Sequence, residues 1–386
     1  MDQVFAVRQV CEKYLANGKM YSACLWDLEK AYDTIDRHGV WQMLRVYGVG
    51  GKLLKAVQSF FIDSRACVRM ENYVNEWFPV NVGLRQGCVM SPWLFNVYMD
   101  GVVREVNEKV LGKGLELLSV NGGRFEIHQL LFANDTALEA DSEEKLCRLV
   151  SQFGRVCKRR KLRVNVGKSN VMRCSRYGNG SRMHMILNGE PLEEVDCFKY
   201  LWSHVTADGG CERDVVHSMN EGYRAWGALK SVLSNRGLWI KSKKCLYERV
   251  LVPTALYGAE AWGMKSAERK KVNVLEMKCL RSLVGLSRRD RVRNEEVRRR
   301  AGIEREFASR ADQRVLRWLG HVERMDEYRL ARTVLMAEVS VGWARGRLRL
   351  GWMDGLKVAL GNRAMTVEAA RQCAKEWRAL VHKYLN

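Results

Sequence analysis

The chain has 386 residues, 47% of them hydrophobic, which is enough for two or three cores because single domains usually hold roughly 100 to 200 residues. Its 65 Lys and Arg against 44 Asp and Glu give a formal net charge of +21, which favours a polyanionic partner and, among these, nucleic acid over acidic lipid. The cysteines form no Cys-x-x-Cys pair and no apolar run reaches the roughly 18 residues of a membrane span, so neither a disulfide scaffold nor a membrane-spanning protein is expected.

The first half of the chain mixes the periods of helices and strands. Residues 1–8 carry charge at once and lead into a helix, unlike a signal or transit peptide, so an intracellular protein is expected. Further on, the pattern predicts a buried strand at 21–27, helices at 38–48, 52–62 and 92–110, a hairpin over 125–138, and strands at 183–187 and 195–201. The turn-favouring pair Asn134-Asp135 is expected at the tip of the hairpin.

Beyond Gly210 the pattern becomes helical almost to the end of the chain. In a helix that starts near Cys211, apolar residues recur at spacings of three and four along one face: Val215, Met219, Tyr223, Trp226, Leu229 and Leu233. Gly237 is a suitable C-terminal stop for this helix. The switch from a mixed to a helical pattern predicts an α+β domain followed by all-α domains.

Two acidic positions give the first indication of chemistry. Asp27 ends a buried apolar strand, where a lone carboxylate is costly to desolvate without a partner or a metal, although it could also simply cap the next helix. The hairpin could bring Asp135 beside Asp27 on an adjacent strand. Clustered carboxylates are the ligands that Mg²⁺ prefers, and two such ions could activate a 3′ hydroxyl and stabilise a departing pyrophosphate.

Four ordered motifs make a family resemblance specific. They are Asp27-Leu-Glu-Lys-Ala-Tyr-Asp33, Gly83-Leu-Arg-Gln-Gly-Cys-Val-Met-Ser-Pro92, Leu131-Phe-Ala-Asn-Asp135 and Phe198-Lys-Tyr-Leu201. In order and spacing this set resembles the palm motifs of reverse transcriptases. Two downstream strings, residues 251–262 and 317–324, are similar to the RTE-like group of retrotransposons without long terminal repeats.

The resemblance implies an architecture and an activity. A right-hand polymerase palm with incomplete fingers would occupy residues 1–206, a helical thumb residues 207–286, and a basic helical region that binds nucleic acid residues 287–386. The chain would be an RNA-directed DNA polymerase, adding deoxynucleoside triphosphates to a DNA primer on an RNA template with two Mg²⁺ ions. A nuclear location is expected because these elements use chromosomal DNA as primer. The family's template-clamping fingers motifs and N-terminal endonuclease are not expected in this chain.

Carried over residue by residue, the resemblance implies a catalytic centre. Asp27 and Asp135 would be metal ligands, and Asn134 stands where the family's Ala-Asp-Asp tip has a carboxylate. Lys168 matches the lysine thought to protonate the pyrophosphate leaving group. Taken by itself, a lone lysine is more often a solvated surface charge.

The resemblance also implies a nucleotide site. Tyr32 would be the steric gate that rejects a ribose 2′-hydroxyl. Gln86, with Arg85 and Gly87, would contact the incoming deoxynucleotide, and the glycine leaves room for close approach. Without the motif order, Tyr32 could be a core residue and Gln86 an ordinary loop hydrogen-bonder.

Two departures from the family pattern bear on activity. Asn134 is nearly isosteric with Asp, so the hairpin should fold unchanged, but a neutral amide oxygen replaces a charged ligand, and poor or absent polymerisation is expected. Trp202 stands where the family has glycine, at a tight turn beside the primer grip, so overpacking or a shifted backbone is expected.

The C-terminal region carries dense positive charge. Residues 288–300, beginning with Arg288 and Arg289, place many arginines in little more than three helical turns, which suits nucleic-acid binding. The alternative is a solvated face without a ligand. The next helix is expected to present one basic face made of Arg310, Arg314, Arg317 and His321, opposite an apolar face. Arg345 and Arg347, next to Trp343, suit contact with a single strand, and no zinc-ligand spacing is present.

Three hypotheses remain open on this sequence. The first is an enzyme by descent. The second is a polymerase-derived fold that only binds RNA or DNA, which needs the basic helices but not the carboxylates, so that Asn134 discriminates between the two. The third is a translated relic without a role. A group II intron maturase fits less well, because the downstream strings match the retrotransposon pattern.

Overall fold

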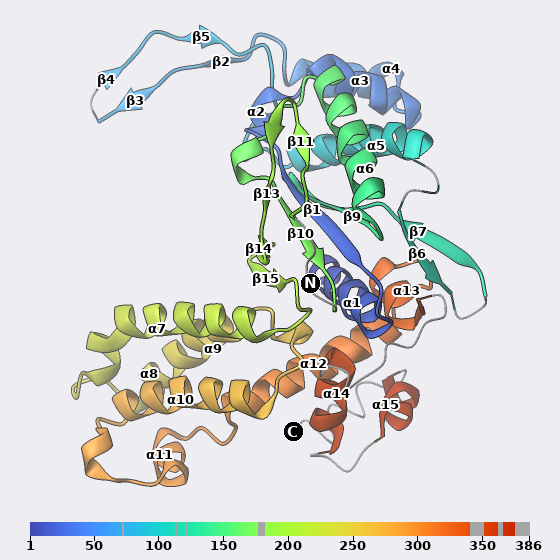
Figure 1. Ribbon diagram of the computed structural model, residues 1–386. Helices are drawn as coiled ribbons and strands as arrows, with labels where there is room; N and C mark the ends of the chain where they lie inside the picture. The colour runs from blue at the N-terminus through green and yellow to red at the C-terminus, as the bar shows by residue number, and fades with distance from the viewer. Residues whose placement is uncertain are drawn as a thin grey trace.

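A five-stranded sheet lies at the centre of the first half of the chain (Figure 1). Its middle strand β1 (Tyr21–Asp27) pairs antiparallel with β9 (Asp135–Ala140) and β10 (Asn170–Cys174). β8 (Gln129–Phe132) and β13 (Glu193–Glu194) form the edges, so the strand order is β13-β10-β1-β9-β8. The computed structural model describes residues 1–71, 73–110, 112, 114–119, 122–176, 182–339, 351–361 and 366–374.

Helices and short two-stranded ribbons surround this sheet. The helical elements are α1 (Asp2–Ala16), α2 (Ala31–Thr34), α3 (Arg37–Val46), α4 (Gly51–Ser59), α5 (Ser91–Val110), α6 (Glu143–Arg159) and the 3₁₀ turn η1 (Val166–Lys168). The ribbons pair β2 (Arg65–Ala66) with β5 (Phe78–Pro79), β3 (Arg69–Met70) with β4 (Tyr73–Val74), β6 (Leu115–Leu118) with β7 (Arg124–Ile127), β11 (Ile186–Leu187) with β12 (Glu190–Pro191) and β14 (Cys197–Tyr200) with β15 (Ser203–Thr206). The ribbon made by β2 to β5 projects away from the sheet (Figure 1).

Side chains of β1 alternate between two cores because successive strand residues point to opposite faces. Cys24 and Trp26 pack in the core that α5 and α6 cover. Tyr21 and Ala23 pack on the other face, in the core that includes α1 and the β14–β15 ribbon. Asp27 has the parity of Tyr21 and Ala23, so its carboxylate lies on the α1 face.

The start of α6 follows from its sequence. Ser142 is the N-cap, and its Oγ accepts a hydrogen bond from the backbone N–H of Lys145 at 3.2 Å. Acidic residues occupy the first turn and basic residues the last, as the helix dipole favours. The apolar side of the helix packs on the sheet, where Phe153 meets Trp26 edge-on at 5.1 Å between ring centroids.

Glu139 in β9 has a fully buried carboxyl, which within the described part of the chain accepts one hydrogen bond, from the Tyr21 hydroxyl at 3.1 Å. Burial raises the pKa of this carboxyl from 4.5 to about 8. Between these two pH values the folded chain holds a proton that the unfolded chain releases. We therefore expect the free energy of unfolding to fall with rising pH by up to about 1.4 kcal/mol per unit in this window. Urea unfolding of the Glu139→Gln chain from pH 5 to 8 should show a smaller decrease of the free energy of unfolding with pH. The decrease that remains includes the contribution of Glu12, whose pKa burial raises to about 7. An unchanged slope would contradict the assignment.

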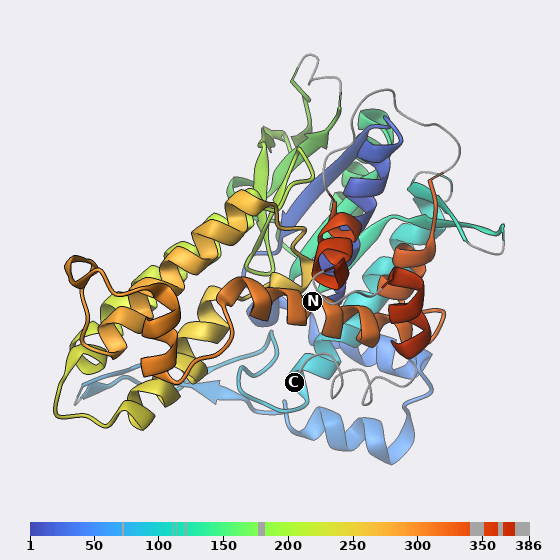
Figure 2. The same ribbon diagram turned by 90° about the horizontal axis from the view of Figure 1, so that it is seen from below.

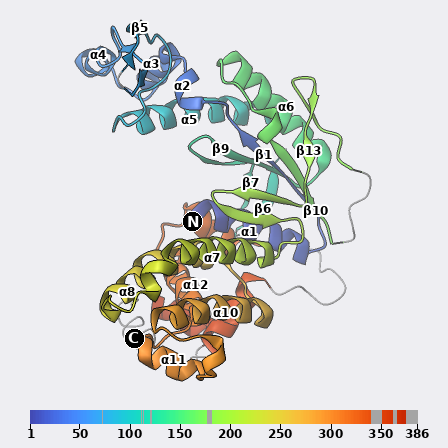
Figure 3. The ribbon, with the colours of Figure 1, turned by 90° about the vertical axis from the view of Figure 1, so that its left-hand side faces the viewer.

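The second half of the described chain is helical. Its elements are α7 (Glu212–Ser234), α8 (Ile240–Leu246), the π-helical turn η2 (Tyr247–Leu251), α9 (Val252–Ala255), η3 (Ala259–Ala261), α10 (Ser266–Leu283), η4 (Arg288–Asp290), α11 (Asn294–Ala301), α12 (Phe307–Glu323), α13 (Leu330–Met336), α14 (Trp352–Gly361) and α15 (Val367–Ala374). α7 packs on β15, α10 on α7, and α11 on α10, so these elements follow one another away from the sheet (Figure 1, Figure 3).

The last helices return to the N-terminal helix, as the orange and red segments of Figure 2 show beside the blue one. Phe5 of α1 meets Trp318 and Trp352 edge-on, with ring centroids 5.6 and 5.0 Å apart. Residues beyond 286, such as Phe307, share a core with Leu280 of α10, so one core crosses the expected boundary at that position. The division into three ranges stays a prediction.

The expected α+β class is confirmed, with an all-α second half. The expected strand at 21–27 has these bounds, and the three expected helices of this half are present within a few residues. Among the described residues, no helix is both long and apolar enough to cross a lipid bilayer.

Candidate active site

The register of the central sheet brings two carboxylates together. Asp27, the last residue of β1, lies opposite Asp135, the first residue of β9. Burial raises the pKa of Asp27, and burial together with the negative charge of Asp27 raises the pKa of Asp135. Side chains directly opposite across a strand pair are about 5 Å apart, a distance at which two ionised carboxylates repel unless a cation lies between them. The pair is therefore suited to a bound cation.

Asn134 lies in the turn that precedes Asp135. β8 and β9 pair up to Phe132 and Asp135, so the turn consists of Ala133 and Asn134, with Ala133 at a φ of 53°. The prediction of an Asn134-Asp135 tip is wrong by one residue, because Ala133 adopts the left-handed backbone and Asp135 already belongs to the strand. Asp135 is therefore fixed by the strand, and Asn134 is the residue before it, in the turn.

The segment that contains Lys168 is fastened to the end of β1. The backbone N–H of Asn165 donates to the carbonyl oxygen of Asp27 at 2.9 Å, and the N–H of Asp27 donates to Ser169 Oγ at 3.2 Å. Lys168 is exposed, and its positive charge partly offsets the effect of burial by lowering the pKa of Asp27. Sequence motifs far apart in the chain thus bring a cation beside the carboxylate pair.

The glycine-rich loop after residue 82 lies on the segment that follows β1. The N–H of Leu84 donates to the carbonyl oxygen of Tyr32 at 2.7 Å. Gly83 has a φ of 80°, and a Cβ there would lie 2.6 Å from the carbonyl oxygen of Asp33, so both backbone conformation and space require glycine. The Tyr32 ring is stacked on Phe95 at 4.5 Å between centroids and is fixed by that contact.

Gln86 and Arg85 are oriented differently from each other. Gln86 Nε2 donates to Asp33 Oδ1 at 2.9 Å, which joins the loop to the Tyr32 segment. Arg85 Nη2 donates to Ser64 Oγ at 3.1 Å, at the base of the projecting ribbon. Gly87 has a φ of 81° and open space around its α-carbon. Sequence reasoning missed Asp33 and Ser64, although Asp33 ends a quoted motif.

The donor set can be compared with what a metal needs. Among the residues that the structure describes, no three His, Cys, Asp or Glu side chains gather to hold a metal ion. Asp27 and Asp135 offer carboxylate oxygens, which hard divalent cations such as Mg²⁺ prefer, so the pair fits one such ion. Asn134, the residue before Asp135, offers only a neutral amide oxygen in place of the expected carboxylate, so a donor set for two ions lacks one negative charge.

Trp202 lies at the tip of the β14–β15 ribbon. The expectation of overpacking is wrong, because its side chain is 66% exposed and Lys199 Nζ lies 3.6 Å from its ring centroid. The alternative expectation of a shifted backbone stays a prediction, and Leu201 and Trp202 have φ values of 49° and 67°, as in the hairpin turns that favour Asn-Gly.

We expect Trp202→Gly to raise the free energy of unfolding by about 0.5–1 kcal/mol, because a left-handed backbone costs an L-residue roughly 1–2 kcal/mol. Trp202→Val should lower it by a similar amount, since β-branched residues tolerate positive φ least. Urea unfolding of the three chains provides the measurement. A Val variant as stable as the Gly variant would contradict the strain.

The basic residues divide into outward and inward groups. Arg288, Arg289 and Arg317 are exposed. Arg310 forms a double hydrogen bond with Glu248 at 2.7 and 2.9 Å, and Arg314 Nη1 donates to the carbonyl oxygen of Leu256 at 2.7 Å. The prediction of one basic face along α12 is therefore wrong for these two, whose guanidinium groups bind η2 and the residue after α9.

The remaining predictions for the basic C-terminal region have mixed outcomes. The expected continuous helix over residues 288–300 is interrupted, because η4 ends at Asp290 and α11 begins at Asn294. The apolar face expected opposite the basic one is confirmed, since Ala311, Val315, Trp318 and Val322 are all buried. Arg345 and Arg347 lie outside the described residues.

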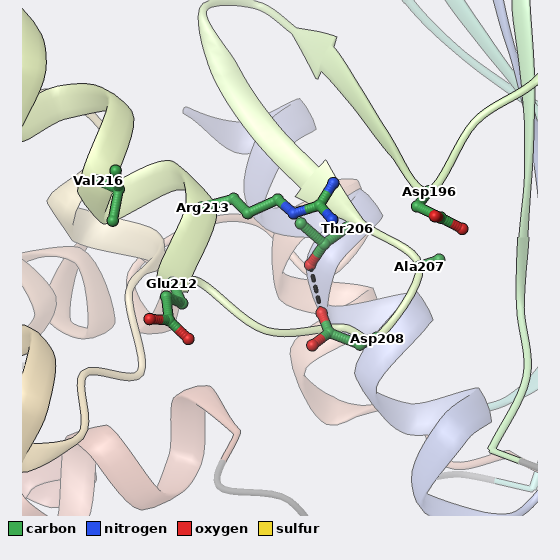
Figure 4. A pocket seen from close by; sticks show the side chains of 7 residues that line it. All are labelled: Asp196, Thr206, Ala207, Asp208, Glu212, Arg213 and Val216. Atoms are coloured by element: carbon green, nitrogen blue, oxygen red, sulfur yellow. Dashed lines mark hydrogen bonds between the residues drawn. The ribbon is translucent and has the colours of Figure 1, made fainter.

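A cavity of about 520 Å³ opens where β15 leads into α7 (Figure 4). It is lined by Asp196, Thr206, Ala207, Asp208, Glu212, Arg213 and Val216. Thr206 Oγ1 donates to Asp208 Oδ1 at 2.6 Å, and Glu212 is paired with Lys271 at 2.8 Å. Three carboxylates against one guanidinium do not suit a phosphate-bearing ligand.

Several known proteins are similar to this chain. A transposon-derived protein of Caenorhabditis elegans is 26% identical over 287 residues, which cover 69% of this chain and 98% of that protein. The retrovirus-related Pol polyprotein from the type-1 retrotransposable element R2 of Popillia japonica is 21% identical, covering 70% of this chain and 43% of the polyprotein. The RNA-directed DNA polymerase from the mobile element jockey of Drosophila melanogaster is 22% identical, covering 74% of this chain and 30% of that protein.

Among solved structures, the telomerase of Candida tropicalis in complex with a telomeric RNA fragment aligns with 97% of this chain and 51% of its own, at 10% identity and a TM-score of 0.44. The chain spans less than half the length of its R2 and jockey relatives. These relatives support the expected placement among retrotransposons without long terminal repeats, whereas the RTE-like subgroup stays a prediction. Residues 3–204, just over half of the 386, match the family model of reverse transcriptases, and the chain belongs to this family of RNA-dependent DNA polymerases.

Proposed function

We propose that this chain carries the polymerase site of a retrotransposon reverse transcriptase, which adds deoxynucleotides to a DNA primer on an RNA template. The proposal rests above all on the cross-strand pairing of Asp27 with Asp135, two motif carboxylates separated by more than a hundred residues of sequence. Family membership over residues 3–204 supports it. Activity is proposed to be low in this chain because of Asn134.

Asp27 and Asp135 would hold Mg²⁺, which when bound would activate the primer 3′ hydroxyl and stabilise the pyrophosphate. Lys168, whose charge already acts on Asp27, would supply a proton to the leaving group. Its exposed position leaves the ammonium free to reach a triphosphate.

The nucleotide would bind beside the carboxylate pair. Tyr32, fixed by its stacking on Phe95, would exclude a ribose 2′-hydroxyl. Gln86, held by Asp33, would position the sugar, and Gly87 leaves space for close approach. Arg85 would have to leave Ser64 to reach a phosphate, so its role requires a movement of its side chain.

Nucleic acid would be held by exposed cations of the helical half. Arg288, Arg289 and Arg317 are free to meet phosphates, whereas Arg310 and Arg314 support the fold of α12. Arg345 and Arg347 are further proposed contacts. A nuclear location is proposed with the use of chromosomal DNA as primer.

The test is primer extension by an Asn134→Asp chain and by the same chain with Asp27→Asn. We expect Mg²⁺-dependent extension of a DNA primer on an RNA template by the first and at least about a hundredfold less by the second, because a metal ligand is lost. Asp36→Asn, a neighbouring half-buried carboxylate outside the pair, is the matched control. Extension that survives Asp27→Asn would refute the assigned site.

A nucleic-acid-binding protein without polymerase activity is the second candidate, favoured by Asn134 beside the carboxylate pair. It predicts that the natural chain does not extend a primer even if the Asn134→Asp chain does, while both chains bind template–primer hybrid equally. Failure of cooperative unfolding in both chains would instead favour a relic without function.

A further inference from the structure

The loop between α10 and α11 presents arginines without acidic partners. Four of its residues are exposed and make no side-chain ion pair or hydrogen bond within the described chain: Arg288, Arg289, Arg291 and Arg293. We call residues 287–293 the arginine loop. Its one carboxylate, Asp290, accepts a hydrogen bond from the backbone N–H of Ser287 at 2.6 Å and is thereby used within the loop.

Arg281 of α10 fixes the arginine loop from within. Its Nη1 donates to the carbonyl oxygen of Ser287 at 3.4 Å, and its Nη2 donates to the carbonyl oxygen of Val292 at 2.8 Å and to Asn294 Oδ1 at 3.1 Å. Both ends of the loop are thus tied to one guanidinium. Because the loop is already ordered, less conformational entropy is lost when its outer arginines bind a ligand.

The arginines that follow in α11 are paired with carboxylates, unlike those of the arginine loop. Arg298 is paired with Glu276 at 2.8 Å and with Glu306 at 3.0 Å. Glu296 accepts hydrogen bonds from Arg299 and Arg300, both at 2.7 Å. Of the carboxylates next to the loop, Glu295 is exposed and is outnumbered by the four free cations.

The arginine loop lies far from the carboxylate pair. The sheet, α7, α10 and α11 follow one another, and the loop joins the last two (Figure 1, Figure 3). Asp27 and Asp135 lie in strands of the central sheet, whereas the loop lies at the far end of this series of elements. A ligand on the loop therefore occupies a different place from the proposed primer terminus.

We propose that the arginine loop is a second nucleic-acid-binding surface, which holds the phosphate backbone of a duplex outside the polymerase site. Guanidinium groups form paired hydrogen bonds with phosphates and stay charged at all physiological pH values. An acidic membrane fits less well, because no large apolar side chain is exposed between Val274 and Tyr328 that could enter a lipid interface. This inference rests on the proposed function, which assigns Arg288 and Arg289 to nucleic acid in general, and adds that the loop is a separate site for a duplex.

The test compares a loop variant with a control that removes equal charge. Arg288, Arg289 and Arg293 are changed to Gln together; the control changes Arg148, Arg155 and Lys158, exposed cations of α6, to Gln. Binding of a labelled duplex of about 20 base pairs, as RNA and as DNA of the same sequence, is followed by fluorescence anisotropy at several salt concentrations. We expect at least a tenfold loss for the loop variant, a salt slope lower by about 2–3, and less than a twofold change for the control.

Two further measurements make the outcome decisive. Arg281→Lys keeps the charge but cannot tie both ends of the loop, so an intermediate loss is expected. Stoichiometric titration should give two bound duplexes per natural chain and one per loop-variant chain. One bound duplex per natural chain and none per loop-variant chain would support the loop site while contradicting binding at the polymerase site. Equal stoichiometry and affinity in both chains would overturn the proposal, as would a loop variant that loses only its binding to phosphatidylserine vesicles. Comparison of the RNA and DNA arms identifies the duplex that the loop prefers.

Discussion

An Asn134→Asp chain is expected to extend a DNA primer on an RNA template at least about a hundredfold faster than the natural chain. The side chain gains a negative charge and a second ligand oxygen beside Asp135 at nearly unchanged volume. A group that stabilises charge in a transition state contributes about 3–4 kcal/mol, and each 1.36 kcal/mol is a factor of ten in rate. Because Asn134 lies in a turn whose positive φ falls on Ala133, the hairpin itself should be unaffected.

Single-turnover rates at several Mg²⁺ concentrations provide the measurement. The Asn134→Asp chain should also reach half of its maximal rate at a lower Mg²⁺ concentration, since a third carboxylate raises the affinity for a hard cation. Asn235→Asp, an exposed position at the end of α7, adds the same charge elsewhere and should leave the rate unchanged. Equal rates for the natural chain and the Asn134→Asp chain would refute the role assigned to Asn134.

The centre of the fold was predictable because its signals are local. A mostly apolar run of seven residues predicted β1 with its correct bounds, Tyr21–Asp27. The hairpin was predicted with its tip one residue too late, because sequence statistics favour Asn over Ala for a positive φ whereas Ala133 adopts it here. The predicted strand and hairpin suggested that Asp135 lies beside Asp27, whereas only the motif order assigned Lys168 to the same site.

Helix periodicity could not predict the partners of the basic residues on α12. Spacings of three and four correctly put Arg310, Arg314 and Arg317 on one side of a helix, but they do not tell what packs against that side. The partners are Glu248 on η2 and Leu256 just after α9, which only the tertiary fold brings into contact with α12. An exposed position was therefore assumed for two arginines that the fold uses internally.

A buried ion pair between Arg8 and Asp214 had no sequence signal at all. The first residue lies on α1 and the second on α7, and both were expected only as ordinary helix positions. Arg8 Nη2 lies 2.7 Å from Asp214 Oδ2, and the two side chains are 6% and 1% exposed. Three further donors converge on the carboxylate: the backbone N–H of His204 and Trp262 Nε1, each at 2.7 Å, and Ser203 Oγ at 3.3 Å. One carboxylate thus joins α1, the β14–β15 ribbon, α7 and the segment after η3.

Asp214→Asn is expected to lower the free energy of unfolding by about 3–5 kcal/mol, because it leaves the guanidinium of Arg8 buried without a countercharge. In asparagine an NH2 group also replaces one of the two acceptor oxygens, so a donor then faces the donor group of His204 or Trp262. Urea unfolding measures the loss, and Glu221→Gln in the exposed pair with Arg224 should cost less than about 1 kcal/mol.

A variant that lacks both charges distinguishes the cost of a buried unpaired charge from the cost of losing the ion pair. Arg8→Met combined with Asp214→Leu should be less destabilising than Asp214→Asn alone, since apolar side chains of similar size leave no buried ion without a partner. If the double variant were instead the least stable, the pair would be worth more than its desolvation costs. Loss of less than about 1 kcal/mol in Asp214→Asn would contradict the role of this carboxylate as the joint between the N-terminal helix and the helical half.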